Sequence, residues 1–393
     1  MRVLVHAQHL SGAGHFVRMY EVARELAAHH AVTLVDGGRP VPRGVHAGRA
    51  EPTLLPLPRL VRGPGVGGLA AWDAQTPLAT VLAERRRALE AHLDAAPPDV
   101  VVVEHYPFSK WEVGPELDAL VAAARAVNPR VKVVASLRDL PGQTKHEAMP
   151  AEAYAARVLE RQAAFDLVLV HGEAELTPLA ASVPFAAQIP IPVVHTGMVG
   201  EPLRPDPAAS AAILSLTDGA PFVLLSSGGG AARSDLAERV VAAWRALPRP
   251  AHAQDDLRLV VCGGLEAAGA EATRDDDGIV RLGFRADFLA WLAAAAASVS
   301  HAGYNTCANL VATAARALLV PHPRMSDQAP RAALFERLGL AAALPADADP
   351  AAIAHALGRV LAGPKPLPRV RLDGAARARD ALERLAQGDR ARP

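Results

Sequence analysis

The feature of this sequence that most constrains the fold is a series of short, almost wholly apolar segments that alternate with helical ones. Asp99–Glu104 runs Asp-Val-Val-Val-Val-Glu, and Phe222–Ser226 runs Phe-Val-Leu-Leu-Ser. Strands that are apolar on both faces are typical of parallel sheets covered by helices on each side. The alternation therefore predicts an α/β protein with parallel sheets.

The first half of the chain predicts one such sheet. Its expected strands are 2–6, 32–35, 99–104, 131–137 and 167–170. A loop containing Gly12 and Gly14 follows the first strand and leads into a helix. Val17 stands where a dinucleotide fingerprint would have its third glycine, which disfavours a Rossmann dehydrogenase. Residues 37–68 are rich in Pro and Gly and show no convincing periodicity beyond 54–58, and we expect them to form a long surface excursion.

The second half repeats the pattern after a stretch rich in Pro and Gly, 190–207, which we interpret as a linker. Expected strands are 222–226, 257–262, 279–282 and 317–321. A chain of 393 residues is long enough for two domains. We expect a first domain over 1–198, a second over 199–368, and a C-terminal helix, 369–393, that packs back on the first.

Composition excludes several classes of partner. Lys plus Arg and Asp plus Glu both number 41, so the net charge is zero and gives no footprint for nucleic acid. The two cysteines, Cys262 and Cys307, are expected to be reduced, as in a cytoplasmic protein. The first strand begins at Arg2, so no signal peptide is expected. The longest apolar run, 288–299, is too short to span a bilayer, which leaves only peripheral membrane contact open.

The stretch Ser300-His301-Ala302-Gly303-Tyr304-Asn305-Thr306 lies where a strand ends and a helix begins. Gly303 lets the backbone approach a ligand, and the helix start offers unpaired N–H groups and a positive dipole end. This arrangement suits an anion, most simply a phosphate. The alternative is an ordinary helix capped by Asn305 or Thr306.

Two further loops follow strands of the same half. Gly228, Gly229 and Gly230 could form an anion-binding nest, or only a tight turn. Asp327 and Gln328 could hold sugar hydroxyls, or be only a helix cap and its neighbour. Because parallel strands place such loops at one edge of the sheet, three of them together favour a binding site.

These motifs carry a resemblance to a known family. The order of a glycine loop, Gly283-Phe284, His-Ala-Gly-Tyr-Asn-Thr and Asp-Gln resembles the donor-binding domain of GT-B nucleotide-sugar glycosyltransferases. Near-full-length features, including the opening Gln-His-Leu-Ser-Gly-Ala-Gly-His, resemble a group of bacterial glycosyltransferases related to the peptidoglycan N-acetylglucosaminyltransferase. The resemblance implies two Rossmann-like doubly wound domains facing across a cleft, with a family 28-like C-terminal domain.

The resemblance also implies roles for individual residues. The donor diphosphate would be held by Gly228, Gly229, Gly230, His301, Gly303, Asn305 and Thr306. Phe284 and Asn309 would contact the nucleoside, Phe284 mainly through its backbone, and Asp327 and Gln328 would bind the donor sugar. His15 would be the general base, with His6 and His9 as nearby rivals. Candidates on the acceptor side are Gly12, Gly14, Glu104, Arg138 and Asp139; the last two could instead pair with neighbours.

One position departs from the family pattern. Asn309 stands where the family has a glutamate that binds ribose hydroxyls, which weakens the assignment of the nucleotide. A UDP-sugar is the expected donor. No Asp-x-Asp pair presents itself as a metal site, so metal independence is expected, with no cofactor besides the nucleotide-sugar co-substrate.

The sequence therefore predicts a glycosyltransferase that moves a sugar from a nucleoside diphosphate to an unidentified acceptor hydroxyl. Alternatives with the same fold are a nucleotide-sugar hydrolase and an epimerase. An alternative from another class is a non-catalytic protein that binds a nucleotide-sugar.

Overall fold

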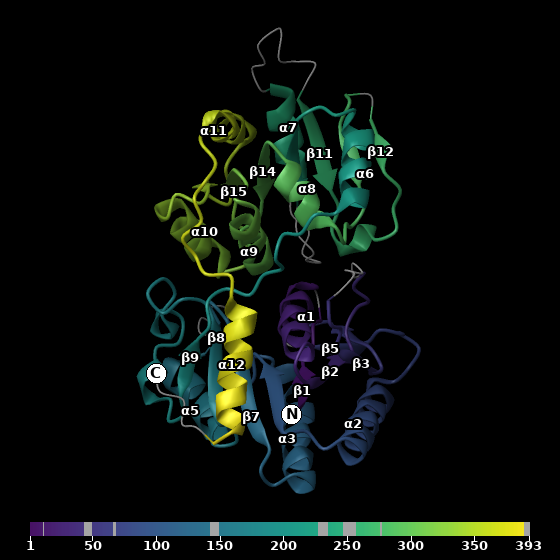
Figure 1. Cartoon of the computed structure of the whole chain (residues 1–393), viewed down its shortest axis with the longest axis vertical. Coiled ribbons are helices and arrows are strands. Elements are labelled where there is room, and N and C mark those ends of the chain that lie inside the picture. Colours follow the sequence, from purple (N-terminus) through teal and green to yellow (C-terminus); the bar gives the residue numbers. More distant parts are fainter. Residues whose placement is uncertain are drawn as a thin grey trace. The chain divides into compact units, whose positions relative to one another are not determined.

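The computed structural model describes residues 1–10, 12–42, 49–65, 68–141, 149–226, 235–246, 257–275 and 277–388. The chain divides into two compact units (Figure 1). The N-terminal unit contains the described residues of Met1–Pro40 and His46–Gly200 and those from Arg371 onward, and the C-terminal unit contains those of Val41–Val45 and Glu201–Val370. The predicted domain boundaries lie at 198/199 and 368/369.

A seven-stranded parallel sheet forms the centre of the N-terminal unit, in the order β3-β2-β1-β6-β7-β8-β9. Its strands are β1 (Arg2–His6), β2 (Ala31–Asp36), β3 (Thr53–Pro56), β6 (Val100–Glu104), β7 (Lys132–Arg138), β8 (Leu167–His171) and β9 (Val193–His195). The helices are α1 (Gly14–Ala27), α2 (Leu78–Ala95), α3 (Gly114–Val127), α5 (Ala151–Gln162) and α12 (Gly374–Ala386). Every residue of β6 and of β8 is buried, as expected for strands covered on both faces.

Two stretches of this unit contain short strands that the sequence pattern did not indicate. The stretch 37–68 contains β3, which pairs with β2, and β4 (Leu60–Arg62), which pairs antiparallel with β5 (Leu69–Ala71). The expected linker, 190–207, contains the boundary between the units at 200/201, but it also contains β9, the edge strand of the sheet. These strands are short, and β3 and β9 are only partly buried edge strands, so they leave little alternation in the sequence.

The C-terminal helix α12 belongs to the N-terminal unit, where it packs against α1 (Figure 1, yellow). His30 Nε2 lies 2.8 Å from Glu383 Oε1, and Arg379 pairs with Glu25. The chain enters this helix through a close backbone contact, since a Cβ on Gly374 would lie 2.5 Å from the carbonyl oxygen of Gly197. Only glycine fits there.

A second seven-stranded sheet forms the C-terminal unit, in the order β12-β13-β11-β10-β14-β15-β16. Its strands are β10 (Phe222–Ser226), β11 (Arg258–Cys262), β12 (Thr273–Arg274), β13 (Val280–Leu282), β14 (Ala297–Ser300), β15 (Ala317–Leu319) and β16 (Ala342–Ala343). The helices are α6 (Pro207–Thr217), α7 (Leu236–Ala246), α8 (Phe288–Ala294), α9 (Tyr304–Thr313), α10 (Gln328–Arg337) and α11 (Pro350–Ala362). Only β12 is antiparallel to its neighbour.

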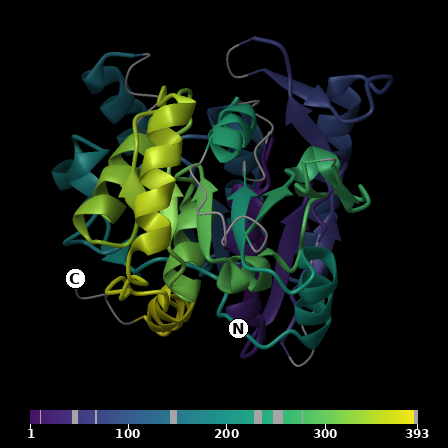
Figure 2. The same cartoon turned by 90° about the horizontal axis from the view of Figure 1, so that it is seen from above.

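Helices cover both faces of this second sheet (Figures 1 and 2). Helices α7 and α11 pack against each other, and their buried residues share one core with β10, β14 and β15. Helix α8 contacts both α6 and α9. The prediction of two doubly wound α/β units is confirmed.

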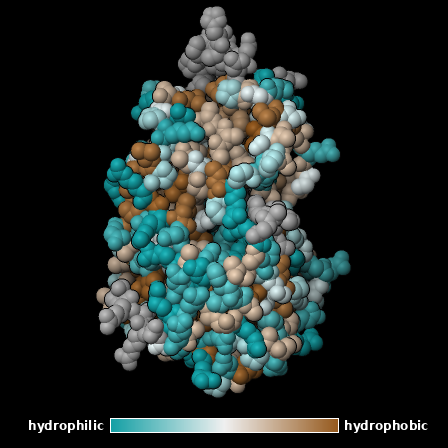
Figure 3. All heavy atoms as spheres, in the orientation of Figure 1, coloured by the Kyte–Doolittle hydropathy of each residue, from teal (hydrophilic) through white to brown (hydrophobic). Residues whose placement is uncertain are grey.

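No helix among the described ranges is long and apolar enough to cross a membrane. The face drawn in Figure 3 is largely hydrophilic over the N-terminal unit and shows more hydrophobic residues over the C-terminal unit. The large hydrophobic side chains that are exposed come from separate segments, namely Val17, Trp72, Leu203, Leu214, Met325 and Leu367.

Candidate functional site

The strand order places a switch point at the centre of the N-terminal sheet. Strand β1 continues toward β2 on one side, and β6 continues toward β7 on the other. Open α/β sheets bind ligands at the carboxyl ends of the two strands where the order reverses. The loops after β1 and after β6 are therefore the place to look for a site.

His15, in the first turn of α1, meets the last residue of β6 at this point. Its Nδ1 lies 2.5 Å from Glu104 Oε1. The Glu104 side chain is fully buried, whereas that of His15 is 28% exposed. An Nδ1–H that donates to the carboxylate leaves the lone pair on Nε2, the nitrogen that can accept a proton. The structure thus brings together two of the residues predicted from the sequence.

The groups around Glu104 determine the protonation states of this pair. Arg18 forms an ion pair with Glu104 Oε1, and His105 Nε2 lies 3.7 Å from the same oxygen. Burial opposes ionisation of Glu104, but His15, His105 and the Arg18 guanidinium hold its pKa well below the usual range. Burial lowers the pKa of His15 to about 4, although Glu104 acts against it. At neutral pH the carboxylate is therefore charged and the imidazole is neutral.

The two rival histidines are held by buried contacts. His6 Nε2 lies 3.0 Å from Glu116 Oε1, and His9 Nε2 lies 2.7 Å from the carbonyl oxygen of Arg39. Both side chains are about 1% exposed. A ring with this little exposure is poorly placed to reach an acceptor hydroxyl, so the geometry favours His15.

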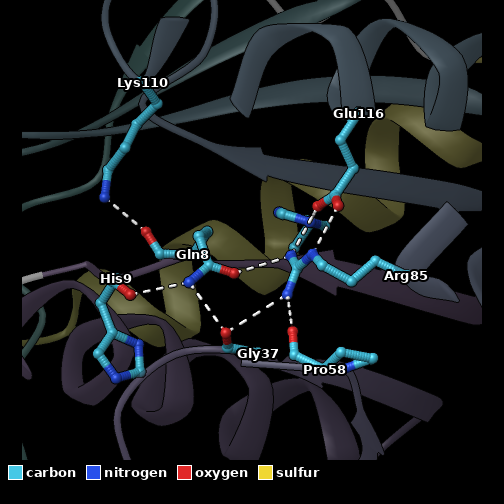
Figure 4. Close-up of polar contacts among 8 residues, drawn as sticks. Gln8, His9, Gly37, Pro58, Arg85, Lys110 and Glu116 are labelled. Carbon is cyan, nitrogen blue, oxygen red and sulfur yellow. Dashed lines mark hydrogen bonds and ion pairs between the residues drawn. The ribbon is translucent and has the colours of Figure 1, made fainter. Parts of the chain in front are cut away.

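A buried polar network fixes the loop that leads from β1 toward His15 (Figure 4). The fully buried Arg85 donates to both carboxylate oxygens of Glu116 and to Gln8 Oε1, at 2.7, 2.7 and 2.8 Å. Lys110 donates to the carbonyl oxygen of Gln8. A Cβ on Gly37 would lie 2.3 Å from Arg85 Nη1, so the network also requires a glycine there.

The other acceptor-side candidates lie at the same edge. Gly14 begins α1, and Gly12 is in the loop before it. Arg138 ends β7, and its backbone N–H donates to His105 Nε2 at 3.4 Å. Asp139 is buried and accepts a hydrogen bond from the N–H of Leu140 at 2.9 Å. A role in acceptor binding stays a prediction for all four.

Within the described part of the chain, His15, Glu104 and His105 form a group whose ligand atoms lie within 4.8 Å of one another, close enough for a metal ion. Arg18 already occupies the Glu104 oxygen that faces His15. Lys110 and Arg138 add positive charge near the two histidines. A divalent cation would be repelled by these groups, so the donor set fits a metal poorly.

The C-terminal sheet has the same kind of switch point between β10 and β14. The loop after β10, with Gly228, Gly229 and Gly230, lies outside the described residues. His301 directly follows β14 and is 5% exposed. Its Nδ1 lies 2.7 Å from the carbonyl oxygen of Val320, and its Nε2 has no partner. Burial lowers the pKa of His301, so the ring is neutral at pH 7.

Helix α9 starts beside His301, with Gly303 at its N-cap and no side chain capping it. Asn305 and Thr306 lie in the first turn, so neither is the cap, and Asn309 lies one turn further on. A Cβ on Gly303 would meet only Thr306 Oγ1, at an ordinary 3.7 Å. The protein itself does not need glycine here, which is consistent with close approach by a ligand.

Arg331 on α10 connects two of the predicted donor-site segments, the stretch 300–306 and the loop with Asp327, and no motif singled it out. This fully buried guanidinium donates to Asp327 Oδ2 at 2.9 Å and to the carbonyl oxygen of Ala302 at 2.8 Å. It also lies 5.9 Å from the ring centre of Tyr304. The Asp327/Arg331 spacing of four residues along a helix was the available signal.

Two more predicted residues lie near the same edge. Gln328 Oε1 accepts a hydrogen bond from the backbone N–H of His322 at 2.9 Å. Phe284 follows β13, and its N–H donates to the carbonyl oxygen of Ala267 at 3.2 Å. Only the Phe284 carbonyl is then left for the expected backbone contact with a nucleobase.

Comparisons with known proteins agree with this architecture. Residues 248–385 match the family described as glycosyltransferase family 28 C-terminal domain. The chain is similar to the UDP-N-acetylglucosamine--N-acetylmuramyl-(pentapeptide) pyrophosphoryl-undecaprenol N-acetylglucosamine transferase of Methylorubrum populi, with 32% identity over 203 residues. That match covers 49% of this chain and 54% of the relative, so the chain spans about half the length of the curated relative it matches.

Solved structures resemble the whole chain. The calicheamicin glycosyltransferase CalG4 is 21% identical, with a TM-score of 0.55, and covers 100% of this chain and 99% of its own. VinC in complex with DTDP is 19% identical, with a TM-score of 0.56 and coverage of 99% and 100%. Medicago truncatula UGT71G1 complexed with UDP-glucose is 14% identical, with a TM-score of 0.58 and coverage of 98% and 94%.

The fold is therefore that of the GT-B glycosyltransferases. Residues 248–385 match the glycosyltransferase family 28 C-terminal domain, and about half of the chain is similar to part of a peptidoglycan N-acetylglucosaminyltransferase. The resemblance inferred from the sequence motifs is confirmed.

Proposed function

We propose that this protein is a glycosyltransferase that moves a sugar from a nucleoside diphosphate to an acceptor hydroxyl, with His15 as general base. The observation that carries the proposal is the pairing of His15 with Glu104 at the N-terminal switch point. The family 28 domain and the GT-B fold support the same reaction class. Fold alone would not, since one fold hosts many activities.

The chemistry follows from the tautomer that Glu104 imposes. The oxygen of the acceptor hydroxyl attacks the anomeric carbon of the donor, and His15 Nε2 accepts the proton of that hydroxyl. The bond between that carbon and the diphosphate oxygen breaks, and its electron pair leaves with the diphosphate. The charged carboxylate of Glu104 stabilises the imidazolium that forms, as the orienting acid does in other base–acid pairs.

The C-terminal unit supplies the donor site in this proposal. His301, Gly303, Asn305 and Thr306, with Gly228, Gly229 and Gly230, would hold the diphosphate. Phe284 and Asn309 would contact the nucleoside, and Asp327 and Gln328 the sugar. A UDP-sugar is the proposed donor because the curated relative is named for UDP-N-acetylglucosamine and UGT71G1 was solved with UDP-glucose. The DTDP bound to VinC makes dTDP-sugars the first competitors to test.

We further propose that the reaction needs no metal and no cofactor. The charge of the leaving diphosphate would be met by the start of α9 and by imidazole groups rather than by a cation. In the N-terminal unit Arg18 already pairs with the carboxylate of the His15 group, and Lys110 and Arg138 add positive charge near His15. Transfer should therefore proceed in the presence of a chelator.

The test is product analysis by mass spectrometry. Purified protein is incubated with UDP-glucose, UDP-N-acetylglucosamine and a dTDP-sugar, each with a mixture of sugar and phenol acceptors, with and without EDTA. A sugar joined to an acceptor, at the same rate in EDTA, is the expected result. Free sugar formed without any acceptor would identify a hydrolase, and a changed donor sugar an epimerase. Donor binding without turnover across the panel would contradict an enzymatic role.

A further inference from the structure

A second imidazole lies beside His301 that no motif singled out. His322 follows β15, the strand next to β14, and the two strands run parallel with Ser300 opposite Leu319. Both histidines are therefore at the carboxyl edge of the sheet, and their ring centres are 5.0 Å apart. Each side chain is 5% exposed. Two buried histidines thus meet next to the uncapped start of α9.

The hydrogen bonds fix complementary tautomers for this pair. The backbone N–H of Arg324 donates to His322 Nδ1 at 3.1 Å, so the proton of the neutral ring is on Nε2. His301 Nδ1 donates to the carbonyl oxygen of Val320, which leaves a lone pair on its Nε2. Neither Nε2 atom has a partner, although both are buried. His322 therefore presents an N–H donor that needs no further protonation.

Unpartnered buried donors are rare in proteins because each loses its hydrogen bond to water without a replacement. The buried Nε2–H of His322, at a switch point and beside the start of α9, is explained if an acceptor oxygen of a ligand completes it, and His301 Nε2 can join that contact by taking up a proton when the ligand binds. An internal water would also satisfy one nitrogen, but it would not explain why the two histidines lie at the switch point.

We propose that His322 is a second imidazole ligand of the donor diphosphate, paired with His301. This inference rests on the proposed function, and it assigns the diphosphate a contact outside the glycine loops and α9. His322 Nε2–H donates to a diphosphate oxygen. The backbone of the same residue holds Gln328, one of the proposed sugar-binding residues, so one segment orders two parts of the donor.

The experiment separates the two ring nitrogens of His322. His322→Asn keeps an acceptor near the Nδ1 position for the Arg324 N–H and removes the donor, whereas His322→Gln places an amide N–H near the Nε2 position. UDP and inorganic pyrophosphate are titrated into each variant by calorimetry. We expect His322→Asn to weaken binding of both by about 10-fold to 100-fold, the loss of one charge-assisted hydrogen bond, and His322→Gln to stay within about threefold of wild type.

Controls make the outcome specific. His355→Asn, at an exposed position on α11, should leave both affinities unchanged. In wild-type protein the imidazole ¹⁵Nε2 resonance of His322 should shift on addition of UDP, a readout that requires no variant to fold. Unchanged binding by His322→Asn, loss of binding by His322→Gln alone, or a resonance that does not move would each overturn the inference. Wild-type protein that binds neither UDP nor pyrophosphate would overturn the proposed donor site as well.

Discussion

In the N-terminal unit the central strand β6 ends on a buried carboxylate, Glu104, whereas in the C-terminal unit the corresponding strand β14 is followed by an imidazole, His301. Glu104 is engaged by Arg18 and His15. His301 Nε2 and its neighbour His322 Nε2 have no partner. The same sheet topology thus carries an imidazole–carboxylate pair at one edge, where Glu104 Oε2 is still without a partner, and a pair of imidazoles whose Nε2 atoms both lack partners at the other.

This difference indicates how the proposed reaction is divided between the two units. A general base must be oriented before its substrate arrives, and the hydrogen bond from His15 to Glu104 provides that orientation. A site for a diphosphate needs donors that are not already used within the protein. The first edge is therefore suited to chemistry on the acceptor, and the second to binding of the donor.

The largest expected effect is the loss of activity when His15 in the N-terminal unit is replaced. His15→Ala is expected to lower kcat by about 10²-fold to 10⁴-fold, because it removes general base catalysis. UDP affinity should remain that of wild type. Initial-rate kinetics with the best donor check this, with His29→Ala, an exposed histidine just beyond the same helix, as the matched control. Near wild-type rates in His15→Ala would return His6 and His9 to consideration.

Arg331 tests whether the C-terminal edge is ordered before ligand binds. Arg331→Met leaves the buried Asp327 carboxylate without its cation and frees the carbonyl of Ala302. Breaking a buried ion pair costs about 3–5 kcal/mol, so urea unfolding should show a loss of that size. Arg331→Lys keeps the charge and should recover stability while still weakening UDP binding, since lysine cannot make both contacts with the same geometry.

The matched control for Arg331 is Arg337→Met, at an exposed position at the end of the same helix. It should change stability by less than about 0.5 kcal/mol. Equal losses in the two methionine variants would show that the Asp327 contact has no special structural role.

Glu104→Gln removes the negative charge of this side chain while keeping a hydrogen-bond acceptor for His15. We expect kcat to fall by up to about 100-fold, less than for His15→Ala, because the base remains but the imidazolium is no longer stabilised. Donor affinity should not change. Circular dichroism at the assay temperature separates this from unfolding, since Arg18 loses its buried partner. A kcat equal to wild type in folded Glu104→Gln would remove Glu104 from the mechanism.

The pH dependence gives a smaller but diagnostic effect. Burial lowers the pKa of His15 to about 4, so its base form persists well below the ordinary histidine pKa of about 6.5. Between pH 8 and 5.5, kcat/KM should be nearly flat, and it should fall as the pH drops through about 4. A limb centred near 6.5 would contradict the lowered pKa of His15.

Stability sets the lower limit of that measurement. Burial also lowers the pKa of His171, to about 3. For a histidine whose pKa is lower in the folded state, the unfolded chain binds more protons, so stability decreases as the pH falls below about 6.5 and continues to decrease toward the folded-state pKa. Thermal unfolding between pH 6.5 and 4.5 should therefore show a falling Tm, and activity should be read only where the protein is folded.

The parts of the fold that could be predicted were the strands with a strong hydrophobic pattern in the sequence. Strands such as β6 and β10 are buried on both faces and read as apolar runs, whereas β3, β4 and β9 are short and lie at or beyond the sheet edge. Local sequence carries no equivalent signal for them, because their pairing is decided by the rest of the sheet.

The site shows the same limit. His15 and Glu104 could each be named, but their contact joins residues separated by 89 positions and depends on β1 and β6 being neighbours. The spacing of Asp327 and Arg331 was a signal for that ion pair, but the contact of Arg331 with Ala302 and the pairing of His322 with His301 appear only once β14, β15 and α10 are assembled. Resemblance to a family supplied expectations for motif residues and none for these two.

The proposed division, with the base in the N-terminal unit and the diphosphate site in the C-terminal unit, is tested most directly by calorimetry. UDP is titrated into wild type, His15→Ala and His301→Ala under identical conditions. We predict that His15→Ala binds UDP as tightly as wild type, whereas His301→Ala binds at least about tenfold more weakly. Equal weakening in both variants, or full affinity in His301→Ala, would contradict the assignment of the diphosphate to the carboxyl edge of the C-terminal sheet.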